Sequence, residues 1–354
     1  MEIHLSAHNT SRRDPHVAVV VPCHNYGHYL GDCVQSIVNQ PGVTVEVLVL
    51  DDASTDDSAE VASRLAEKYP QVRLIRHATN MGHIATYNEG LRQVDSDYVV
   101  LLSADDMLAA GALSRAAGLM DAYPRVGMVY GHPQNFTTTP DVRVPRLVTW
   151  SVWKGPEWRR LQFRRGLSCI YSPEAVVRTS VQHQVGYYEP SLPATGDLEM
   201  WLRIANVADI GRINGVDQAY RRVHPSSMMH TTFSAPLVDI EERVRAYSHH
   251  LEACDDRDEA ASLRRVMERK ASEVTLGWAR AGIASGKATS SEVDSAQELA
   301  GRLDPAAASS AEWKDLTVRS QGGTTSERLV CDVRDFVRDK RDYLRWRRWR
   351  HLGI

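Results

Sequence analysis

Residues 97–106, DYVVLLSADD, join an apolar run to two adjacent carboxylates, Asp105 and Asp106. The run from Val99 to Leu102 is typical of a strand buried on both faces of a sheet. Two carboxylates at the exit of such a strand repel each other unless a cation lies beside them. The stretch therefore predicts a buried strand whose polar end binds a cation.

Similar apolar runs recur through the first part of the chain. They are VAVVVP from Val17, VEVLVL from Val45, VRLIRH from Val72 and VGMVYG from Val126. The intervening segments have helical spacing, for example Leu30, Val34, Ile37 and Val38. Strands that alternate with helices indicate an α/β fold with a mostly parallel sheet flanked by helices.

Polar segments follow four of these runs: PCHN (22–25), DDASTDD (51–57), RHATNMG (76–82) and SADD (103–106). In such sheets, ligands bind outside the carboxyl ends of the strands. We therefore expect these four segments to meet at one edge. A plainer interpretation stays open, in which Asp51, Asp52, Asp56, Asp105, Asp106 and Asp197 only cap nearby helices.

The alternating pattern stops after Tyr130. Residues 132–165 contain four prolines, and we expect irregular chain and short strands there. Their tryptophans, Trp150, Trp153 and Trp158, suit core packing better than sugar stacking. From Pro236 the chain is polar and helical, and it ends in a basic aromatic tail, residues 334–354, with eight Arg or Lys against three Asp. The tail predicts a helix docked on the body or on a second subunit, with adhesion to a membrane as the alternative.

Composition limits the function classes. The chain has 354 residues and a formal net charge of −3, which argues against extensive nucleic-acid binding. Its five cysteines include no CxxC pair, which is typical of reduced thiols in a cytoplasm. The first 15 residues are polar, so we expect disorder and no signal peptide there. No run of about 18 apolar residues is present, so the sequence predicts no membrane-spanning helix.

Several cofactor motifs are missing. No GxGxxG follows the first strand, GIASGKAT lacks the spacing of a phosphate-binding loop, and His24 and His28 have no third zinc ligand nearby. A nucleoside-diphosphate site fits better. Asp51 and Asp52 can accept hydrogen bonds from a base or ribose, and Asp105 can bind Mg²⁺ or Mn²⁺ together with a diphosphate.

Six segments resemble glycosyltransferase family 2, in the order and spacing of that family. They are residues 19–40, 48–61 (LVLDDASTDDSAEV), 80–91 (NMGHIATYNEGL), 97–106, 185–205 (VGYYEPSLPATGDLEMWLRIA) and 220–229 (YRRVHPSSMM). The resemblance implies a GT-A fold and an inverting transfer from a sugar nucleotide, with UDP-sugars favoured, to an acceptor hydroxyl or amine. It divides the chain into a disordered segment (1–15), a nucleotide-sugar-binding half (16–131), an acceptor-binding catalytic half (132–235) and a helical C-terminal region (236–354).

The same resemblance assigns roles by position. Asp197 becomes the general base that accepts the proton of the acceptor. The metal, Mn²⁺ or Mg²⁺, is assigned to Asp105, Asp106 and His224. The acceptor side is assigned to Trp201, Glu199 and Tyr171, with Glu199 as a fallback base. Donor binding is assigned to Pro22, His24, Asn25, Asp51, Asp52, Asn80, Gly82, Asn88, Ser103, Ala104 and Asp105.

Five positions depart from the family pattern. Ser103 replaces the first acid of the D-x-D element, and Gly196 replaces the acid before Asp197. The others are Ala53 in place of glycine, His24 in place of Tyr or Phe, and Tyr87 in place of Arg. Ser103 and Gly196 keep a second interpretation open, a nucleotide-sugar-binding scaffold without catalysis. A sugar nucleotidyltransferase is less favoured, because PCHNYGHYLG has no cation to hold a triphosphate.

The expected partners are a nucleotide-sugar donor and an acceptor that is a glycan, a lipid-linked sugar or a small molecule. Nucleic acid is not expected, and a homodimer is compatible with the sequence. The expected location is the cytoplasm, with peripheral attachment to the inner membrane face through the tail as the alternative.

Overall fold

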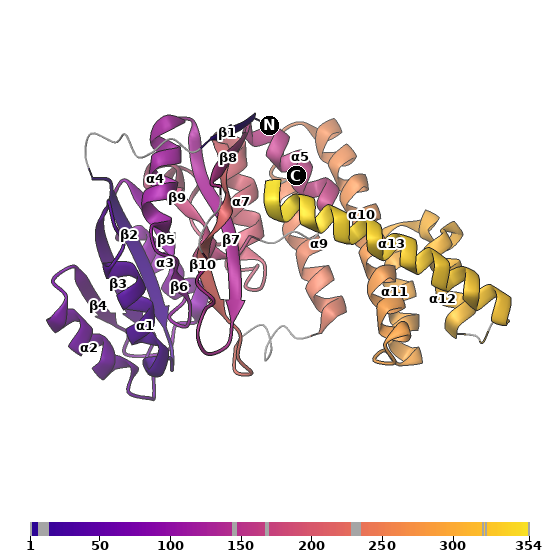
Figure 1. Cartoon of the computed structure of the whole chain (residues 1–354), viewed down its shortest axis with the longest axis horizontal. Helices are drawn as coiled ribbons and strands as arrows, with labels where there is room; N and C mark the ends of the chain where they lie inside the picture. The colour runs from indigo at the N-terminus through magenta and orange to yellow at the C-terminus, as the bar shows by residue number, and fades with distance from the viewer. Residues whose placement is uncertain are drawn as a thin grey trace. The chain divides into compact units, whose positions relative to one another are not determined.

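The computed structural model describes residues 2–5, 14–143, 147–166, 170–227, 235–320, 322 and 324–352. The chain forms two compact units (Figure 1). Unit 1 comprises Met1–Arg159, Cys169–Thr231 and His351–Gly353, and unit 2 comprises Arg160–Ser168, Thr232–Arg350 and Ile354. The two predicted halves, 16–131 and 132–235, both contribute strands to one continuous sheet of unit 1.

The first half of that sheet is parallel, as the sequence predicted. Strands β2 (His16–Cys23), β3 (Thr44–Asp51), β4 (Val72–Arg76) and β5 (Tyr98–Leu101) lie in the order β4-β3-β2-β5. Each neighbouring pair is parallel. Their carboxyl ends therefore meet at one edge, which brings PCHN, DDASTDD and SADD together.

The second half of the sheet is mixed. Strand β9 (Val176–Arg178) lies antiparallel between β5 and β7 (Val126–Phe136), and β10 (Asp209–Arg222) runs parallel to β7. Strands β8 (Thr149–Trp153), β1 (Glu2–Leu5) and β6 (Met107–Leu108) complete it by antiparallel pairing. The long β10 thus carries its C-terminal residues back to the loop after β5.

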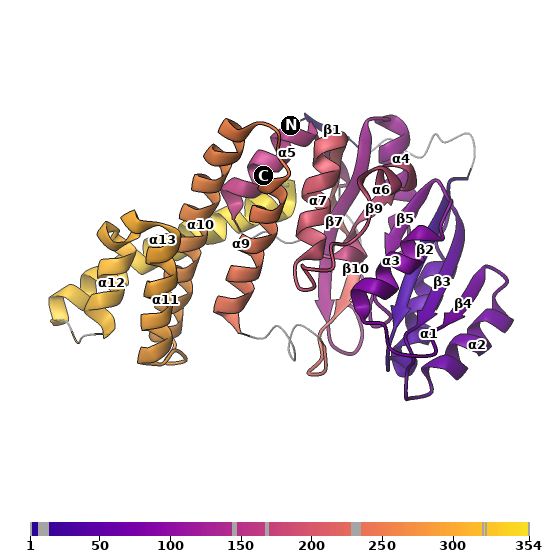
Figure 2. The same ribbon diagram turned by 180° about the vertical axis from the view of Figure 1, so that it is seen from behind.

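Helices flank this sheet, which Figures 1 and 2 show from opposite sides. They are α1 (Gly27–Val38), α2 (Ser58–Lys68), α3 (His83–Arg92), α4 (Ala112–Ala122), α5 (Gly155–Arg165), the 3₁₀ helix η1 (Ser172–Glu174), α6 (Thr179–Val185) and α7 (Gly196–Val207). The apolar face of α1, Leu30, Val34 and Ile37, packs with alternate residues of β2 and β3 in the core. Helix α3 lies on the other face, so close that a Cβ on Gly90 would meet Val20 Cγ1 at 2.4 Å.

Two expectations need correction. Glu2–Leu5 form strand β1 within the segment predicted to be disordered, whereas residues 1 and 6–13 lie outside the described residues. Residues 155–165 form helix α5, where irregular chain was predicted. The three tryptophans of this region, Trp150, Trp153 and Trp158, are at most 4% exposed, so they pack in the core and stack on no sugar.

Unit 2 is helical. It contains α9 (Pro236–Glu252), α10 (Arg257–Ala284), α11 (Ser290–Leu303), η2 (Pro305–Ser309), α12 (Ala311–Ser320) and most of α13 (Thr325–Leu352). Small and branched residues of α10 and α11, such as Leu276 and Val293, form its core. Among the described residues, no helix combines the length and apolar character needed to cross a bilayer.

The turn after β3 is held in a conformation that L-residues disfavour. Ala53 has φ 54° and Asn25 has φ 60°, both in the left-handed region. Asn25, which follows β2, is of a residue type that tolerates this region, and its Oδ1 accepts a hydrogen bond from Thr55 N in the turn after β3 at 2.7 Å. Ala53 has no such compensation from its methyl side chain, so this turn stores strain.

Replacing Ala53 by glycine should therefore stabilise the protein. Glycine removes the left-handed penalty, and its greater freedom in the unfolded chain offsets part of the gain, leaving about 0.5–1 kcal/mol. Urea denaturation monitored by circular dichroism measures the change. Ala78→Gly, at an exposed position after β4 outside the left-handed set, is the control and should not stabilise. Equal or lower stability of Ala53→Gly would contradict the strain.

Candidate functional site

Asp52, at the carboxyl end of β3, organises the start of α3. Its Oδ1 accepts hydrogen bonds from Met81 N and His77 Nδ1, both at 2.8 Å, and its Oδ2 accepts one from Gly82 N at 3.0 Å. Burial raises the pKa of Asp52, but the bonds from Met81, His77 and Thr86 outweigh it, so the pKa is lowered overall. Asp52 is thus an ionised anchor for the turn that carries Asn80 and Gly82.

The nucleotide-side residues His24, Asn25 and Asn80 lie together above this anchor. His24 Nδ1 is 2.8 Å from the main-chain oxygen of Asp52, and its Nε2 is 3.3 Å from Asn80 Nδ2. His24 and Asn80 are exposed, and Pro22 and Asn25 are partly exposed. The predicted flat ring of His24 is therefore available to stack on a base.

Asp51 differs from its neighbour. Its side chain is buried, and Arg76 Nε lies 4.0 Å from Oδ2. Within the described residues, Asp51 Oδ1 has no hydrogen-bond partner. Neither Asp51 nor Asp52 caps α2, whereas Asp56 Oδ1 accepts a bond from Ser58 N at 3.0 Å there. The capping interpretation therefore holds for Asp56 and fails for the other two.

The cation-binding candidates meet where β5 leaves the sheet and β10 ends. Asp105 Oδ2 lies 3.0 Å from His224 Nε2, and His224 Nδ1 lies 2.9 Å from Ser226 Oγ. Asp106 Oδ1 instead accepts a hydrogen bond from Arg222 N at 2.8 Å. Burial and the charge of Asp105 raise the pKa of Asp106 well above its usual range. Residues 107–108 form strand β6, so no helix starts there for these acids to cap.

Arg222 is a site residue that the sequence reasoning missed. It is 6% exposed, and its Nε donates to the main-chain oxygen of Asp105 at 3.0 Å. Its guanidinium lies over the rings of Tyr29 and Phe136, at 4.3 and 4.5 Å from the centroids. The sequence offers only the place of Arg222 in the segment YRRVH, two residues before His224, and its burial and contacts are defined by the folded chain. Arg222 fixes the Asp105 loop against β10.

Metal binding can be tested on this geometry. Among the described residues, no three His, Cys, Asp or Glu side chains form a ready metal cluster. Adjacent ligands of an octahedral ion, each about 2.1 Å from it, lie about 3 Å apart. The Asp105–His224 distance matches that spacing, and the carboxylate oxygen of Asp105 suits Mn²⁺ or Mg²⁺. The pair fits two positions of an ion, whereas Asp106, bonded to Arg222, is not placed as a third.

Asp197 lies in the first turn of α7 and is held from two sides. Its Oδ1 accepts a hydrogen bond from Tyr188 Oη at 2.7 Å, and its Oδ2 accepts one from Ser172 N at 3.2 Å. Burial raises the pKa of Asp197 to about 6, although both bonds act to lower it. A carboxylate with this pKa is a stronger base than an ordinary aspartate and is ionised at neutral pH.

Gly196 and Tyr188 explain one departure from the family pattern. A Cβ at position 196 would lie 2.7 Å from Tyr188 Cδ1, which is closer than any side chain tolerates. An acid there would displace the ring that hydrogen-bonds Asp197. The chain therefore has a tyrosine hydroxyl beside Asp197 in place of a second carboxylate.

Tyr87 connects the two acidic centres. Burial raises the pKa of its phenol, and the charges of Asp197, Asp105 and Asp106 raise it further. The ring also lies edge-on to Tyr188, with centroids 5.5 Å apart. The same Asp105 and Asp106 charges, after burial, raise the pKa of Tyr26 to about 12. The charges of Asp105 and Asp197 therefore both act on the phenol of Tyr87.

Three predicted site residues have structural tasks instead. Asn88 is buried, with its Nδ2 donating to Tyr188 O and its Oδ1 accepting from Tyr188 N, both at 2.8 Å. Glu199 is 1% exposed and forms a two-pronged ion pair with Arg203 Nε at 2.8 and 2.9 Å. Trp201 is buried and donates from Nε1 to Ile170 O at 2.9 Å. These contacts leave neither a fallback base at Glu199 nor an exposed wall at Trp201.

Tyr171 remains at the catalytic end of unit 1. The centroid of its ring lies 4.4 Å from Cζ of the Arg221 guanidinium. The main-chain N of Tyr171 donates a hydrogen bond to Glu174 Oε1 at 3.0 Å. Burial raises the pKa of Glu174 to about 8; the Tyr171 bond and Arg212 act against this, and Asp197 adds to it. Ser103 is partly exposed beside Asp105, and Ala104 is fully buried.

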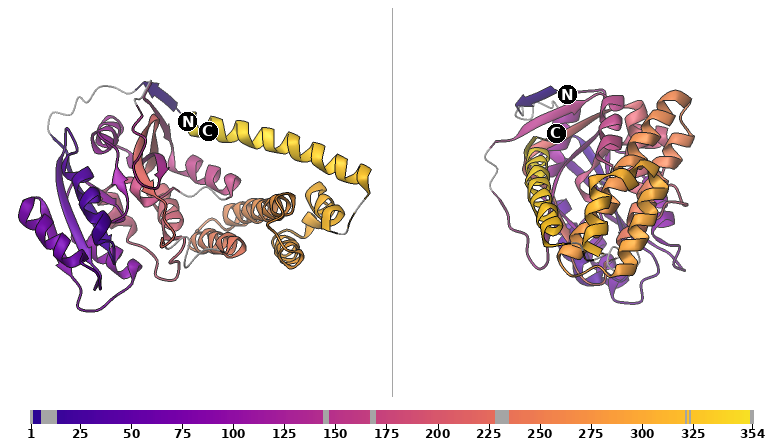
Figure 3. Two further views of the ribbon diagram at one scale, coloured as in Figure 1. Left: turned by 60° about the horizontal axis from the view of Figure 1, so that its bottom comes forward. Right: turned by 90° about the vertical axis from the view of Figure 1, so that its right-hand side faces the viewer.

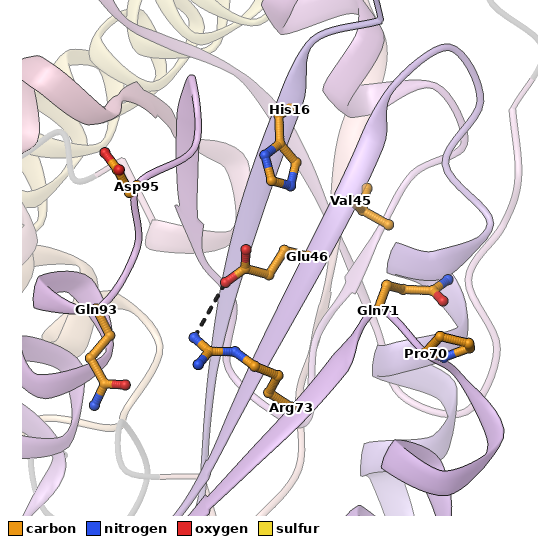
Figure 4. A pocket seen from close by; sticks show the side chains of 8 residues that line it. All are labelled: His16, Val45, Glu46, Pro70, Gln71, Arg73, Gln93 and Asp95. Carbon is orange, nitrogen blue, oxygen red and sulfur yellow. Dashed lines mark hydrogen bonds and ion pairs between the residues drawn. The ribbon is translucent and has the colours of Figure 1, made fainter.

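A surface pocket lies at the opposite edge of the parallel strands. It measures about 500 Å³ and is lined at the amino ends of β2, β3 and β4 (Figure 4) by His16, Val45, Glu46, Pro70, Gln71, Arg73, Gln93 and Asp95. Glu46 and Arg73 already pair there at 3.4 Å. Because ligands of such sheets bind at the opposite, carboxyl ends, this pocket is not the candidate site.

Comparison with known proteins adds the family. A model described as "Glycosyl transferase family 2" matches residues 18–181. These residues belong to glycosyltransferase family 2. An uncharacterized glycosyltransferase, YibD of Escherichia coli K12, is 26% identical over 186 residues, which cover 50% of this chain and 54% of that relative. The chain thus spans about half the length of that curated relative.

Solved structures of low identity share the fold. Staphylococcus aureus TarS 1–349 in complex with UDP-GlcNAc aligns over 87% of this chain and 93% of its own, with TM-score 0.61 and 16% identity. The mannosyltransferase PcManGT from Pyrobaculum calidifontis, in complex with GDP-Man and Mn²⁺, covers 92% and 88%, with TM-score 0.51 and 17% identity. The predicted GT-A fold is confirmed.

The two hydrogen bonds between Asn88 and Tyr188 yield a test of the structural role of Asn88. Asn88→Ala removes two hydrogen bonds and leaves the buried backbone groups of Tyr188 unpaired, so it should lower the free energy of unfolding by about 2–3 kcal/mol. Gln93→Ala, on the exposed side of α3, should change it by less than about 0.5 kcal/mol. Chemical denaturation measures both. An Asn88→Ala protein of unchanged stability would show that these hydrogen bonds are not formed.

Proposed function

We propose that the protein is a metal-dependent, inverting glycosyltransferase. It moves a sugar from a nucleoside-diphosphate sugar, with UDP-sugars favoured, to a hydroxyl or amine of an acceptor. Membership of family 2 and the fold shared with nucleotide-sugar complexes support this class of reaction. The observation that carries the proposal is Asp197, whose carboxylate accepts hydrogen bonds from Tyr188 Oη at 2.7 Å and Ser172 N at 3.2 Å and whose pKa is raised by burial to about 6.

Asp197 is the general base of this proposal. In a single displacement, the acceptor oxygen forms a bond to the anomeric carbon as the bond to the diphosphate breaks. The acceptor proton goes to a carboxylate oxygen of Asp197, and the diphosphate leaves with the electron pair of the broken bond. Tyr188 and Ser172 N orient the carboxylate, and its pKa of about 6 keeps it both ionised and basic near neutral pH.

The donor is placed at the other end of the site. His24, Asn25 and Asn80 line the proposed base and ribose pocket, with the buried Asp51 beneath it, and Ser103 and Asp105 lie on its diphosphate side. Asp52 acts indirectly, by holding the Met81–Gly82 turn. The complexes of TarS with UDP and UDP-GlcNAc support uracil as the base, and the GDP-Man complex of PcManGT keeps guanine as the alternative.

A divalent ion, Mn²⁺ or Mg²⁺, would be held by Asp105 and His224. When bound, it supplies positive charge that stabilises the leaving diphosphate. Arg222 positions the Asp105 loop for this task through the main-chain oxygen of Asp105. The Mn²⁺ present in the PcManGT complex supports a metal of this kind.

On the acceptor side, Tyr171 and Arg221 present an aromatic face and a cation. The acceptor is a glycan, a lipid-linked sugar or a small molecule, and the protein acts in the cytoplasm. The alternative function is that of a scaffold that binds nucleotide sugars without transferring the sugar. Ser103 and Gly196, which stand where the family has acids, favour this alternative.

Release of nucleoside diphosphate tests the proposal against this rival. With UDP-, GDP- and dTDP-sugars and Mn²⁺, at least one donor should yield release that EDTA removes. Asp197→Asn should reduce kcat by at least about 100-fold, because no other placed carboxylate replaces the base. Asp95→Asn, an exposed acid far from the site, should leave kcat unchanged. Donor binding without any release would establish the scaffold instead.

The pH dependence follows from the environment of Asp197. Because the base must be ionised, kcat/KM should rise with pH through about 6 and level off above it. Tyr188→Phe removes a hydrogen bond to the charged form, so the acidic limb should move to higher pH by about one unit. Tyr187→Phe, whose hydroxyl contacts His183, is the matched control and should leave the limb in place. A limb that moves in neither variant would rule out Asp197 as the group reported.

A further inference from the structure

Helix α13 packs on the other helices of unit 2 through its charged face. Arg334 Nη1 lies 2.7 Å from Asp315 Oδ1. The carboxylate of Asp335 forms ion pairs with Arg280 and Arg319, both at 2.8 Å. Arg338 reaches Glu312 at 3.3 Å, and Cys331 is buried on the same side. This face is therefore anchored by ion pairs.

The opposite face of α13 is apolar and exposed. At 100° per residue, Val333, Phe336, Val337 and Leu344 lie on the side opposite Cys331, Asp335 and Arg338. Phe336 is 64% exposed and Val337 62%, and the same stripe includes Leu329, Val330, Val333, Tyr343 and Leu344. Figure 3 shows α13 in yellow as one long helix.

This orientation is the reverse of an ordinary surface helix, whose apolar stripe faces the core and whose charges face water. An exposed apolar stripe of this length marks a contact with another surface. The ion pairs with Asp315 and Asp335 hold the helix in this orientation, so the stripe is a built feature of unit 2.

Basic residues share and flank the stripe. By the same geometry, Lys340 and Arg347 lie within it, and Arg348 lies at its border. All three are exposed. Residues 338–350 hold seven Arg or Lys and two Asp. The surface that binds here must therefore be apolar within and negatively charged at its rim.

We infer that α13 binds an anionic lipid surface in the plane of the interface, with its apolar stripe among the acyl chains. Lys340 and Arg347 extend their cations from the stripe to lipid phosphates while their aliphatic stems stay buried. A second copy of the chain fits less well, because a parallel pairing of two stripes would place like cations against each other. This inference is independent of the proposed reaction.

Vesicle binding by the full chain tests the inference. The protein should float with phosphatidylcholine vesicles that contain about 30 mol% phosphatidylglycerol, and not with phosphatidylcholine alone. Phe336→Ser with Val337→Ser, and separately Lys340→Glu with Arg348→Glu, should each lower the partition coefficient at least about tenfold. Both pairs are exposed, so circular dichroism and melting temperature should stay unchanged.

Matched changes elsewhere are the controls. Val238→Ser on α9 and Arg64→Glu with Arg269→Glu on α2 and α10 alter exposed residues of the same kinds and should leave flotation unchanged. Equal binding to neutral vesicles, or equal loss in the control variants, would overturn the inference. A dimer in light scattering that Phe336→Ser with Val337→Ser dissociates, without vesicle binding, would replace the lipid by a second copy.

Discussion

The site depends on how Arg222 joins the loop after β5 to the end of β10. Its main-chain N binds Asp106, its Nε binds the main-chain oxygen of Asp105, and two residues later His224 reaches the Asp105 carboxylate. Two buried acids side by side strain the loop, since burial and the charge of Asp105 both oppose the ionisation of Asp106. The cation and backbone donor of Arg222 offset that repulsion from the protein side. Asp105 is thereby left with one oxygen facing His224, which is the arrangement a metal ligand needs.

Much of the fold could be predicted because its signals are local. The runs at Val17, Val45, Val72 and Val126 are apolar and β-branched, and each formed the expected strand. Helix α5 was missed because residues 155–165 are polar and begin Gly-Pro, so its buried side, Trp158 and Phe163, shows no clear period. The antiparallel β9 and the strand Glu2–Leu5 depend on partners distant in sequence, which no local pattern reveals.

The candidate site shows the same division. The positions of Asp105 and His224 in the family motifs predicted that they would lie together. The structure places them 3.0 Å apart, although 119 residues separate them in the sequence. Motif position could not distinguish a side chain that faces a ligand from one that faces the backbone. Asn88 and Trp201 bind main-chain groups, and Glu199 binds Arg203, because buried polar atoms must find partners. Arg222, Tyr188 and Ser172 N were missed because their role depends on distances that only the folded chain defines.

Burial raises the pKa of Asp197, and two departures from the family pattern, Tyr87 and Gly196, change the charges around it. An arginine at position 87, usual in the family, would place a cation within reach of the charges of Asp105 and Asp197 and would lower the pKa of the base. Tyr87 is neutral and removes water without adding charge. Gly196 likewise removes a second carboxylate and admits Tyr188, whose hydroxyl restrains the rise in pKa that burial alone would cause. The two departures act on the pKa of Asp197 in opposite directions, because the loss of a cation at position 87 favours a higher value and the loss of a carboxylate at position 196 favours a lower one. Asp197 remains a single oriented carboxylate that is ionised at neutral pH yet basic enough to accept a proton.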